Sequence, residues 1–161
     1  PRMAYIFMTG AGFDHNAMET WDPNEGETAV VIQTKRANPP ACEPYPETLC
    51  CWEERDNLRR EVPREYAVDE TPAEETAYVP QVELDGLAAS ERRDLIIESW
   101  RGNKIGGSPY WLQYEEFPFD DWRLLLQLED GAYPFNLNLG TGVGYVFLNA
   151  ACTEGKLLWQ C

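Results

Sequence analysis

The stretch 104–128, KIGGSPYWLQYEEFPFDDWRLLLQL, constrains the fold of this chain more than any other. Gly106 and Gly107 allow the backbone to take positive φ angles, and Pro109 then fixes the direction of the chain. The end of the stretch, RLLLQL, has the apolar character of a buried strand. We therefore predict a rigid turn, an aromatic and acidic segment and a core strand that follow one another directly.

Aromatic and acidic residues alternate in the middle of this stretch, and two interpretations of them stay open. The rings are either buried in a loop and hairpin, or some face outward with the acids as a binding ledge. Large aromatic side chains ringed by polar groups are typical of protein interfaces. We predict a partner-binding surface, to which Phe117 is a further candidate, made of Tyr110, Trp111, Tyr114, Glu115, Glu116, Phe119, Asp120, Asp121 and Trp122.

A resemblance to a known family rests on this stretch and on later motifs. The pattern KIGGSPYWLQ, then LLLQL, GVGYVFLN and KLLWQC, resembles the YwqG-like family of bacterial proteins, whose domain has no settled function. The upstream segment YIFMTG…TWDPNEGETAVVIQ is similar to the first half of that family. The likeness covers most of the 161 residues, with a weak middle at about residues 40–90, so we expect one domain over residues 1–161. The resemblance suggests a fold and almost no chemistry.

The charge of the chain limits its partners. Acids outnumber bases by 28 to 13, which gives a formal net charge of −15. Such a charge repels the phosphates of nucleic acids and anionic membranes, and it accelerates encounters with basic proteins. We therefore expect a basic protein as partner, no nucleic acid and no membrane. The oligomeric state is left open by the sequence.

Cysteine usage and the absence of a transmembrane pattern point to a reducing compartment. The five cysteines are an odd number, and the adjacent Cys50 and Cys51 are poorly placed for a disulfide with each other. The sequence has no signal peptide and no apolar run that would span a bilayer. We expect free, mostly buried thiols in the bacterial cytoplasm. The chain begins at Pro1, close to an expected strand, which is compatible with a fragment lacking its N-terminal part.

Short apolar runs bounded by polar turns predict five strands, at residues 3–8, 28–34, 123–128, 144–148 and 156–160. The first two and the next two form strand–loop–strand units of similar size, each with a glycine before its second strand. We interpret them as two related units that arose by duplication. The expected architecture is α+β, dominated by a mostly antiparallel sheet, with one main helix against it.

The segment SERRDLIIESW, residues 90–100, is the best helix candidate. Ser90 is a favourable N-cap, and Gly102 is placed to end the helix. Leu95, Ile96 and Trp100 are expected to form its apolar stripe. Residues 50–61 have a composition compatible with a helix but a poor apolar face, so we expect one or two helical turns there at most.

Residues 65–91 contain eight acids and no lysine or arginine. Pro72 and Pro80 exclude a continuous helix, so we expect a partly extended acidic segment. It is either a solvated connection or part of an electronegative docking face. In the second case, a secondary acidic face would consist of Asp69, Glu70, Glu74 and Glu75.

No pattern in the chain indicates catalysis or a metal site. Asp14, His15 and Glu19 lack the tight spacing of zinc ligands, and no CxxC occurs. Ser108 lacks the G-x-S-x-G context of a nucleophile elbow. The glycine-rich run 140–144 lacks the lysine of a phosphate loop and leads into an expected strand. We therefore predict no catalytic residues, no metal and no cofactor.

These observations favour a non-catalytic binding protein. Some YwqG-like proteins are encoded beside secreted bacterial toxins and look like immunity proteins, so the resemblance implies an inhibitor that occludes a basic toxin, with a nuclease as the leading class. The alternative is a housekeeping domain that binds a peptide or small ligand near Gly106, Gly107 and Trp111. A metal-dependent enzyme is the third hypothesis.

Overall fold

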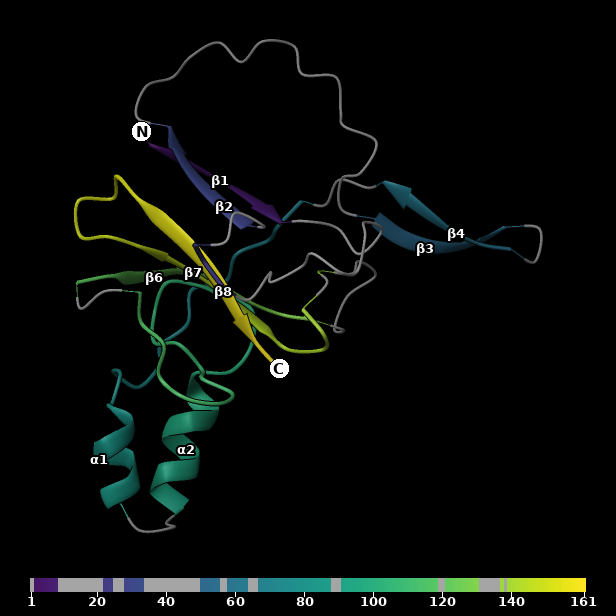
Figure 1. The fold of residues 1–161 in the computed structure, drawn as a ribbon. Helices are drawn as coiled ribbons and strands as arrows, with labels where there is room; N and C mark the ends of the chain where they lie inside the picture. The colour runs from purple at the N-terminus through teal and green to yellow at the C-terminus, as the bar shows by residue number, and fades with distance from the viewer. Residues whose placement is uncertain are drawn as a thin grey trace.

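A six-stranded antiparallel sheet forms the centre of the molecule (Figure 1). The computed structural model describes residues 2–8, 22–24, 28–33, 50–55, 58–63, 67–87, 91–118, 121–130, 137 and 139–161. The order of strands in the sheet is β1-β2-β8-β7-β6-β5. Their bounds are β1 Met3–Met8, β2 Thr28–Gln33, β5 Lys104–Ile105, β6 Arg123–Glu129, β7 Val143–Leu148 and β8 Gly155–Gln160.

The five predicted strands are confirmed within one or two residues as β1, β2, β6, β7 and β8. The two expected strand–loop–strand units are both antiparallel pairs, β1 with β2 and β6 with β7, and β8 lies between them in the sheet. Their common origin stays a prediction. The short strand β5 at the far edge was not predicted, because two residues carry no periodicity.

The core lies where β6, β7 and β8 are adjacent. Strand β7, VGYVFL, pairs on both sides, and five of its six residues are buried. A strand enclosed in this way is apolar on both faces, which explains its unbroken hydrophobic sequence. The main cluster consists of Trp122, Leu124, Val143, Tyr145, Phe147 and Leu158.

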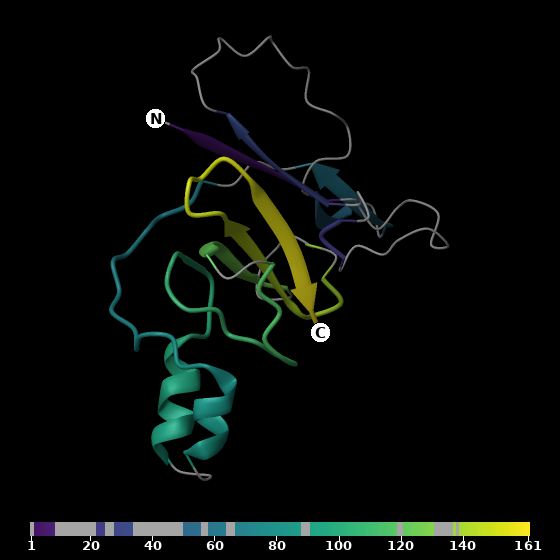
Figure 2. The ribbon, with the colours of Figure 1, turned by 60° about the vertical axis from the view of Figure 1, so that its left-hand side comes forward.

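Two short helices lie side by side at one end of the molecule, beyond the sheet (Figure 2). They are α1, Gln81–Gly86, and α2, Glu91–Ser99. The expectation of one main helix is therefore corrected to two. The acidic segment predicted over residues 65–91 has no helix or strand over 67–80, as expected, but it also contains α1, which was not predicted and begins directly after Pro80, where a proline is tolerated.

Helix α2 confirms the predicted helix, but its apolar stripe differs from the prediction. Ile96 and Trp100 are buried and pack with Leu84 of α1, whereas Leu95 is 71% exposed. Residues four apart share a helix face, while Leu95 lies one position away from Ile96 and so points elsewhere. Gly102 follows the helix with a φ of +93°, as its predicted role requires. Ser90 lies outside the described residues.

The helical turns predicted at residues 50–61 are wrong. The segment forms a separate antiparallel pair, β3 Cys50–Arg55 with β4 Leu58–Pro63. The register places Glu53 opposite Arg60 and Glu54 opposite Arg59. Residues 56 and 57, between the two strands in the sequence, lie outside the described residues.

Neither helix of the described residues has the length or hydropathy that crossing a bilayer requires.

Candidate functional site

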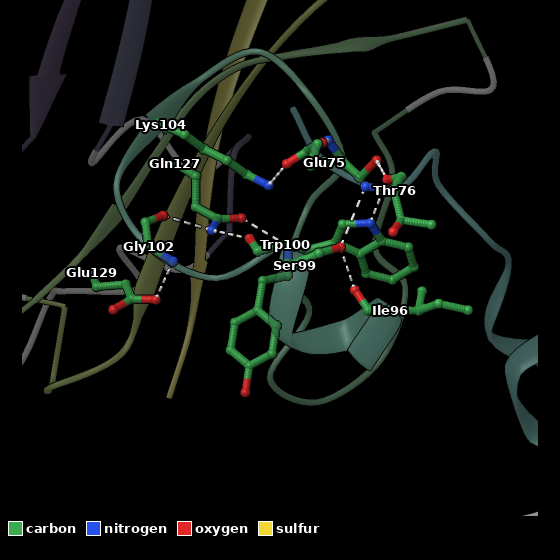
Figure 3. A network of polar contacts seen from close by, with 11 residues as sticks. Glu75, Thr76, Ile96, Ser99, Trp100, Gly102, Lys104, Gln127 and Glu129 are labelled. Atoms are coloured by element: carbon green, nitrogen blue, oxygen red, sulfur yellow. Dashed lines mark hydrogen bonds and ion pairs between the residues drawn. The ribbon is translucent and has the colours of Figure 1, made fainter. Parts of the chain in front are cut away.

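A buried glutamine of β6 holds the segment that follows α2 against the sheet (Figure 3). Gln127 is fully buried, and its side-chain Nε2 donates to the carbonyls of Trp100 and Gly102, each at 2.9 Å. Its Oε1 accepts a hydrogen bond from the backbone N–H of Tyr110 at 2.8 Å. One amide therefore fixes two points of the chain, before and after the glycine turn.

A second buried glutamine, Gln160 of β8, holds the next part of the same segment. Its Oε1 accepts from the backbone N–H groups of Leu112 and Gln113 at 3.1 and 3.2 Å. Its Nε2 donates to the carbonyl of Tyr114 at 2.9 Å and to Oε2 of Glu116 at 3.3 Å. Together, Gln127 and Gln160 fasten residues 100–116, which we call the anchored segment. Buried amides stabilise only when they are satisfied in this way.

The glycine turn closes around the carboxylate of Glu75. Gly106 and Gly107 have φ angles of +77° and +81°, which confirms the predicted positive φ. Lys104 pairs with Glu75 at 2.6 Å, and the backbone N–H of Ser108 donates to the same carboxylate. A Cβ at residue 107 would collide with that carboxylate. The glycine thus makes room for an internal ion pair.

Glu75 consequently differs from the other acids predicted for the secondary acidic face. Asp69, Glu70 and Glu74 are exposed on the extended segment, whereas the side chain of Glu75 is 22% exposed and directed into the turn. Its charge is already matched by Lys104, so Glu75 serves the fold. The other three remain available to a partner.

Three of the predicted partner-binding rings take part in packing. Trp111 packs against Tyr145 and Phe147 of β7, with ring centroids at 4.7 and 5.7 Å. Trp122 belongs to the core cluster and is 8% exposed, so it offers no ring to a partner on this fold. Tyr110 is half-buried, and its hydroxyl accepts from Arg101 at 2.6 Å. Tyr110 and Trp111 therefore pack the anchored segment against the core cluster that contains Trp122.

Other side chains of the anchored segment and the residue after it face outward. Tyr114 is 60% exposed, and Leu112 and Phe117 are also exposed. Phe117 contacts Trp111 edge-on at 5.2 Å, so it rests on the packed rings beneath it. We call the set Leu112, Tyr114, Glu115, Glu116 and Phe117 the ledge. Asp121 is exposed beyond it, and the predicted residues Phe119 and Asp120 lie outside the described residues.

The two acids of the ledge are bound to the fold through hydrogen bonds. Oε1 of Glu115 accepts from the hydroxyl of Tyr78 and from the backbone N–H of Gln81, the first residue of α1. Burial, and then the Glu115 carboxylate, raises the pKa of Tyr78 above its ordinary value. Glu116 accepts from Gln160. Both carboxylates are therefore held in fixed positions, Glu115 exposed and Glu116 half-buried.

The described residues contain no cluster of three or more histidine, cysteine or acidic side chains placed to hold a metal. The set Asp14, His15 and Glu19 lies outside them. Ser108 is buried, and its hydroxyl donates to the carbonyl of Thr76 at 3.3 Å, which is not a catalytic base. Cys152 and Cys161 are free thiols, as expected, but Cys152 is half-buried and Cys161 exposed, so neither has the predicted burial.

A shallow hollow of about 360 Å³ lies where β2 approaches β8. Lys156 lines it, but its Nζ already donates to Asn24 at 2.8 Å and to the carbonyl of Pro23 at 3.4 Å. The place predicted for a small ligand, beside Gly107 and Trp111, contains the carboxylate of Glu75 and the rings of β7. The hollow is lined by residues of β2 and β8 and does not include Gly107 or Trp111, where the ligand was predicted.

The sequence matches no protein-family model, no curated protein and no solved structure. The YwqG-like resemblance therefore rests on its motifs alone, and their geometry explains what they do here. The glycine pair admits Glu75, the tryptophan covers β7, and the glutamines of LLLQL and LLWQ are Gln127 and Gln160. Sequence reasoning missed the two glutamines, although an uncharged polar residue inside an apolar strand is a signal for a buried hydrogen-bond centre.

Proposed function

We propose that this chain is a non-catalytic acidic protein that binds a basic protein through the ledge. The observation that carries the proposal is that exposed Tyr114 and Phe117 stand beside Glu115 and Glu116 on a segment fixed by two buried glutamines. Aromatic anchors held in place lose little conformational freedom on binding, and fixed charges orient the partner.

The net charge of the chain supports a positively charged partner. At −15, the protein attracts a cationic surface over about one Debye length, roughly 8 Å at physiological salt. The exposed acids Asp69, Glu70 and Glu74 extend the negative charge along the acidic segment. A basic partner would therefore associate rapidly, and more slowly as salt is added.

The resemblance to YwqG-like proteins suggests a biological setting for such binding, an immunity protein of the bacterial cytoplasm. A toxin with a nuclease activity fits this setting, because its substrate groove is basic and the carboxylates of the ledge would occupy the positions of phosphates. Blocking that groove inhibits without chemistry, which agrees with a site built from aromatic rings and acids.

The test begins with a basic protein captured on the immobilised chain and then purified. Tyr114→Ala should weaken its binding about 30-fold, the cost of a central interface anchor. Val82→Ala, at an exposed apolar position of α1, is the matched control and should change little. Glu115→Gln keeps a hydrogen-bond acceptor while removing a charge, so it should slow association and reduce the salt dependence, unlike Glu83→Gln on α1.

Two results would reject the proposal. Binding that is equally tight for Tyr114→Ala and the parent protein would place the interface elsewhere. An affinity independent of salt would favour the alternative, a peptide or small ligand recognised through apolar contacts.

A further inference from the structure

The two edges of the six-stranded sheet differ in how they are protected. Strand β5 at one edge has only two residues, one of them Lys104. Strand β1 at the other edge has six residues, MAYIFM, with no charge and no proline. Among the described residues, no strand pairs with the outer side of β1. Short length, lysine and proline are the usual protections of an edge, and β1 has none of them.

The side chains of β1 add an exposed apolar face to this edge. Met3, Tyr5 and Phe7 alternate along the strand, so they share one face of the sheet, and Met3 and Phe7 are 56% and 57% exposed. Val31 lies opposite Tyr5 on β2 and is also exposed. The hydroxyl of Tyr5 donates to Gln33 of β2 at 2.9 Å, consistent with a common face.

We propose that β1 pairs antiparallel with β1 of a second copy of this chain. The edge carries no acid, and the nearest described charge in the sequence is Arg2, so the cationic partner of the ledge finds no complementary charge here. An uncharged apolar strand is the complement of this edge, and β1, MAYIFM, is itself such a strand.

A two-fold axis perpendicular to the sheet satisfies the geometry. It places Tyr5 opposite Tyr5 of the second copy, Met3 opposite Phe7 and Ala4 opposite Ile6. Paired residues then lie on the same face, as an antiparallel ladder requires. The exposed apolar face of one copy continues into that of the other, and the sheet is extended across the axis.

The size and charge of this contact predict a weak dimer with an unusual salt response. A contact limited to one edge strand and its neighbouring face is expected to bury less than the roughly 800 Å² per partner of a standard stable interface. Two chains of −15 also repel each other, and salt screens this repulsion. Self-association should therefore strengthen as salt rises, the opposite of the response expected for a basic partner at the ledge.

Sedimentation velocity over a concentration series, at about 0.05 M and about 0.5 M NaCl, tests the proposal. We expect a concentration-dependent dimer that is favoured at the higher salt. Phe7→Lys should weaken it at least about tenfold, because it places like charges at the edge and removes an apolar contact. Leu95→Lys makes an equal charge change at an exposed site of α2 and should leave a dimer like that of the parent.

Hydrogen exchange on the unaltered protein provides a measurement that does not depend on how a variant folds. The amides of residues 3–8 that point away from β2 should gain protection in concentrated compared with dilute solution. A monomer at every concentration would overturn the proposal, as would a dimer without new protection in β1. Protection of β1 only when a purified foreign protein is added would assign the edge to that protein. The ledge and its basic partner are unaffected by any of these outcomes.

Discussion

Strands β1 and β7 have similar sequences and opposite surroundings. Both have six residues and are rich in aromatic and aliphatic side chains, yet five residues of β7 are buried and none of β1 is. Strand β7 has neighbours on both sides and is covered by Trp111 of the anchored segment. An apolar strand therefore becomes a core strand through what covers it, and here two glutamines hold the covering segment in place.

The β1–β2 hairpin is also attached to the sheet less extensively than β7. Strands β7 and β8 pair through six residue pairs, from Val143 with Gln160 to Leu148 with Gly155. Strand β2 meets β8 at a single pair, Val30 with Gly155. The β1–β2 hairpin is therefore joined to the sheet over a short length, and we expect it to open independently of the rest.

Among the substitutions that test this difference, replacing Gln127 should lower the free energy of unfolding the most. Gln127→Leu leaves the N–H of Tyr110 and the carbonyls of Trp100 and Gly102 without their partner, so we expect a loss of about 3 kcal/mol or more in the free energy of unfolding. Gln33→Leu is the matched control in β2, where the hydroxyl of Tyr5 is the side-chain partner among the described residues, and it should cost about 0.5 kcal/mol.

Urea unfolding followed by tryptophan fluorescence measures both values. Equal losses for the two glutamines would show that the anchored segment is not what distinguishes the two regions.

Gly107→Ala should have the next largest effect. The positive φ of residue 107 is strained for alanine, and the new Cβ would collide with the Glu75 carboxylate. We expect a loss of about 2 to 3 kcal/mol. Gly106→Ala has a similar φ with open space around its Cβ, so it should cost only about 1 kcal/mol. The difference between the two variants, from thermal unfolding, isolates the crowding. A Gly106 loss as large as that of Gly107 would mean that Glu75 moves aside freely.

Gly155→Ala should have the smallest and most local effect. Its Cβ would collide with Val30, so the hairpin should lose about 1 to 2 kcal/mol of its attachment. Hydrogen exchange should show faster opening of β1 and β2 while β6 and β7 keep their protection. The double variant with Val30→Ala should recover part of the loss. Uniform loss of protection across the sheet would contradict the separate opening of the hairpin.

Hydrophobic pattern alone predicted most of the sheet. The runs that became β1, β2, β6, β7 and β8 are short, apolar and bounded by polar segments in the sequence, but their order in the sheet has no such signal. The positive φ of Gly106 and Gly107 was also predicted, because glycine is the residue that adopts it without strain.

The errors lie where local patterns are weak. Residues 50–63 have a composition compatible with a helix and no alternating apolar pattern, so no local signal indicated the pair of β3 and β4. Helix α1 has six residues and depends on packing of Leu84 with Ile96 and Trp100, which no local pattern shows.

The candidate site could be predicted in location but not in the role of its residues. Aromatic and acidic residues in one stretch indicated the ledge, yet which rings face outward depends on contacts made from far away in the sequence. Trp111 is turned inward by β7, and Tyr114 is left outside because Gln160 binds its carbonyl. Such long-range hydrogen bonds have no signature in the stretch itself.

Gln127 and Gln160 contact mainly backbone atoms of the segment that they hold. The outward side chains at positions 112 and 114 can therefore be exchanged while the loop keeps its course, much as a variable loop is carried on a constant framework. Single substitutions at these positions would alter the exposed surface without altering the hydrogen bonds that hold the loop. The same property makes this loop a convenient place to engineer new specificity.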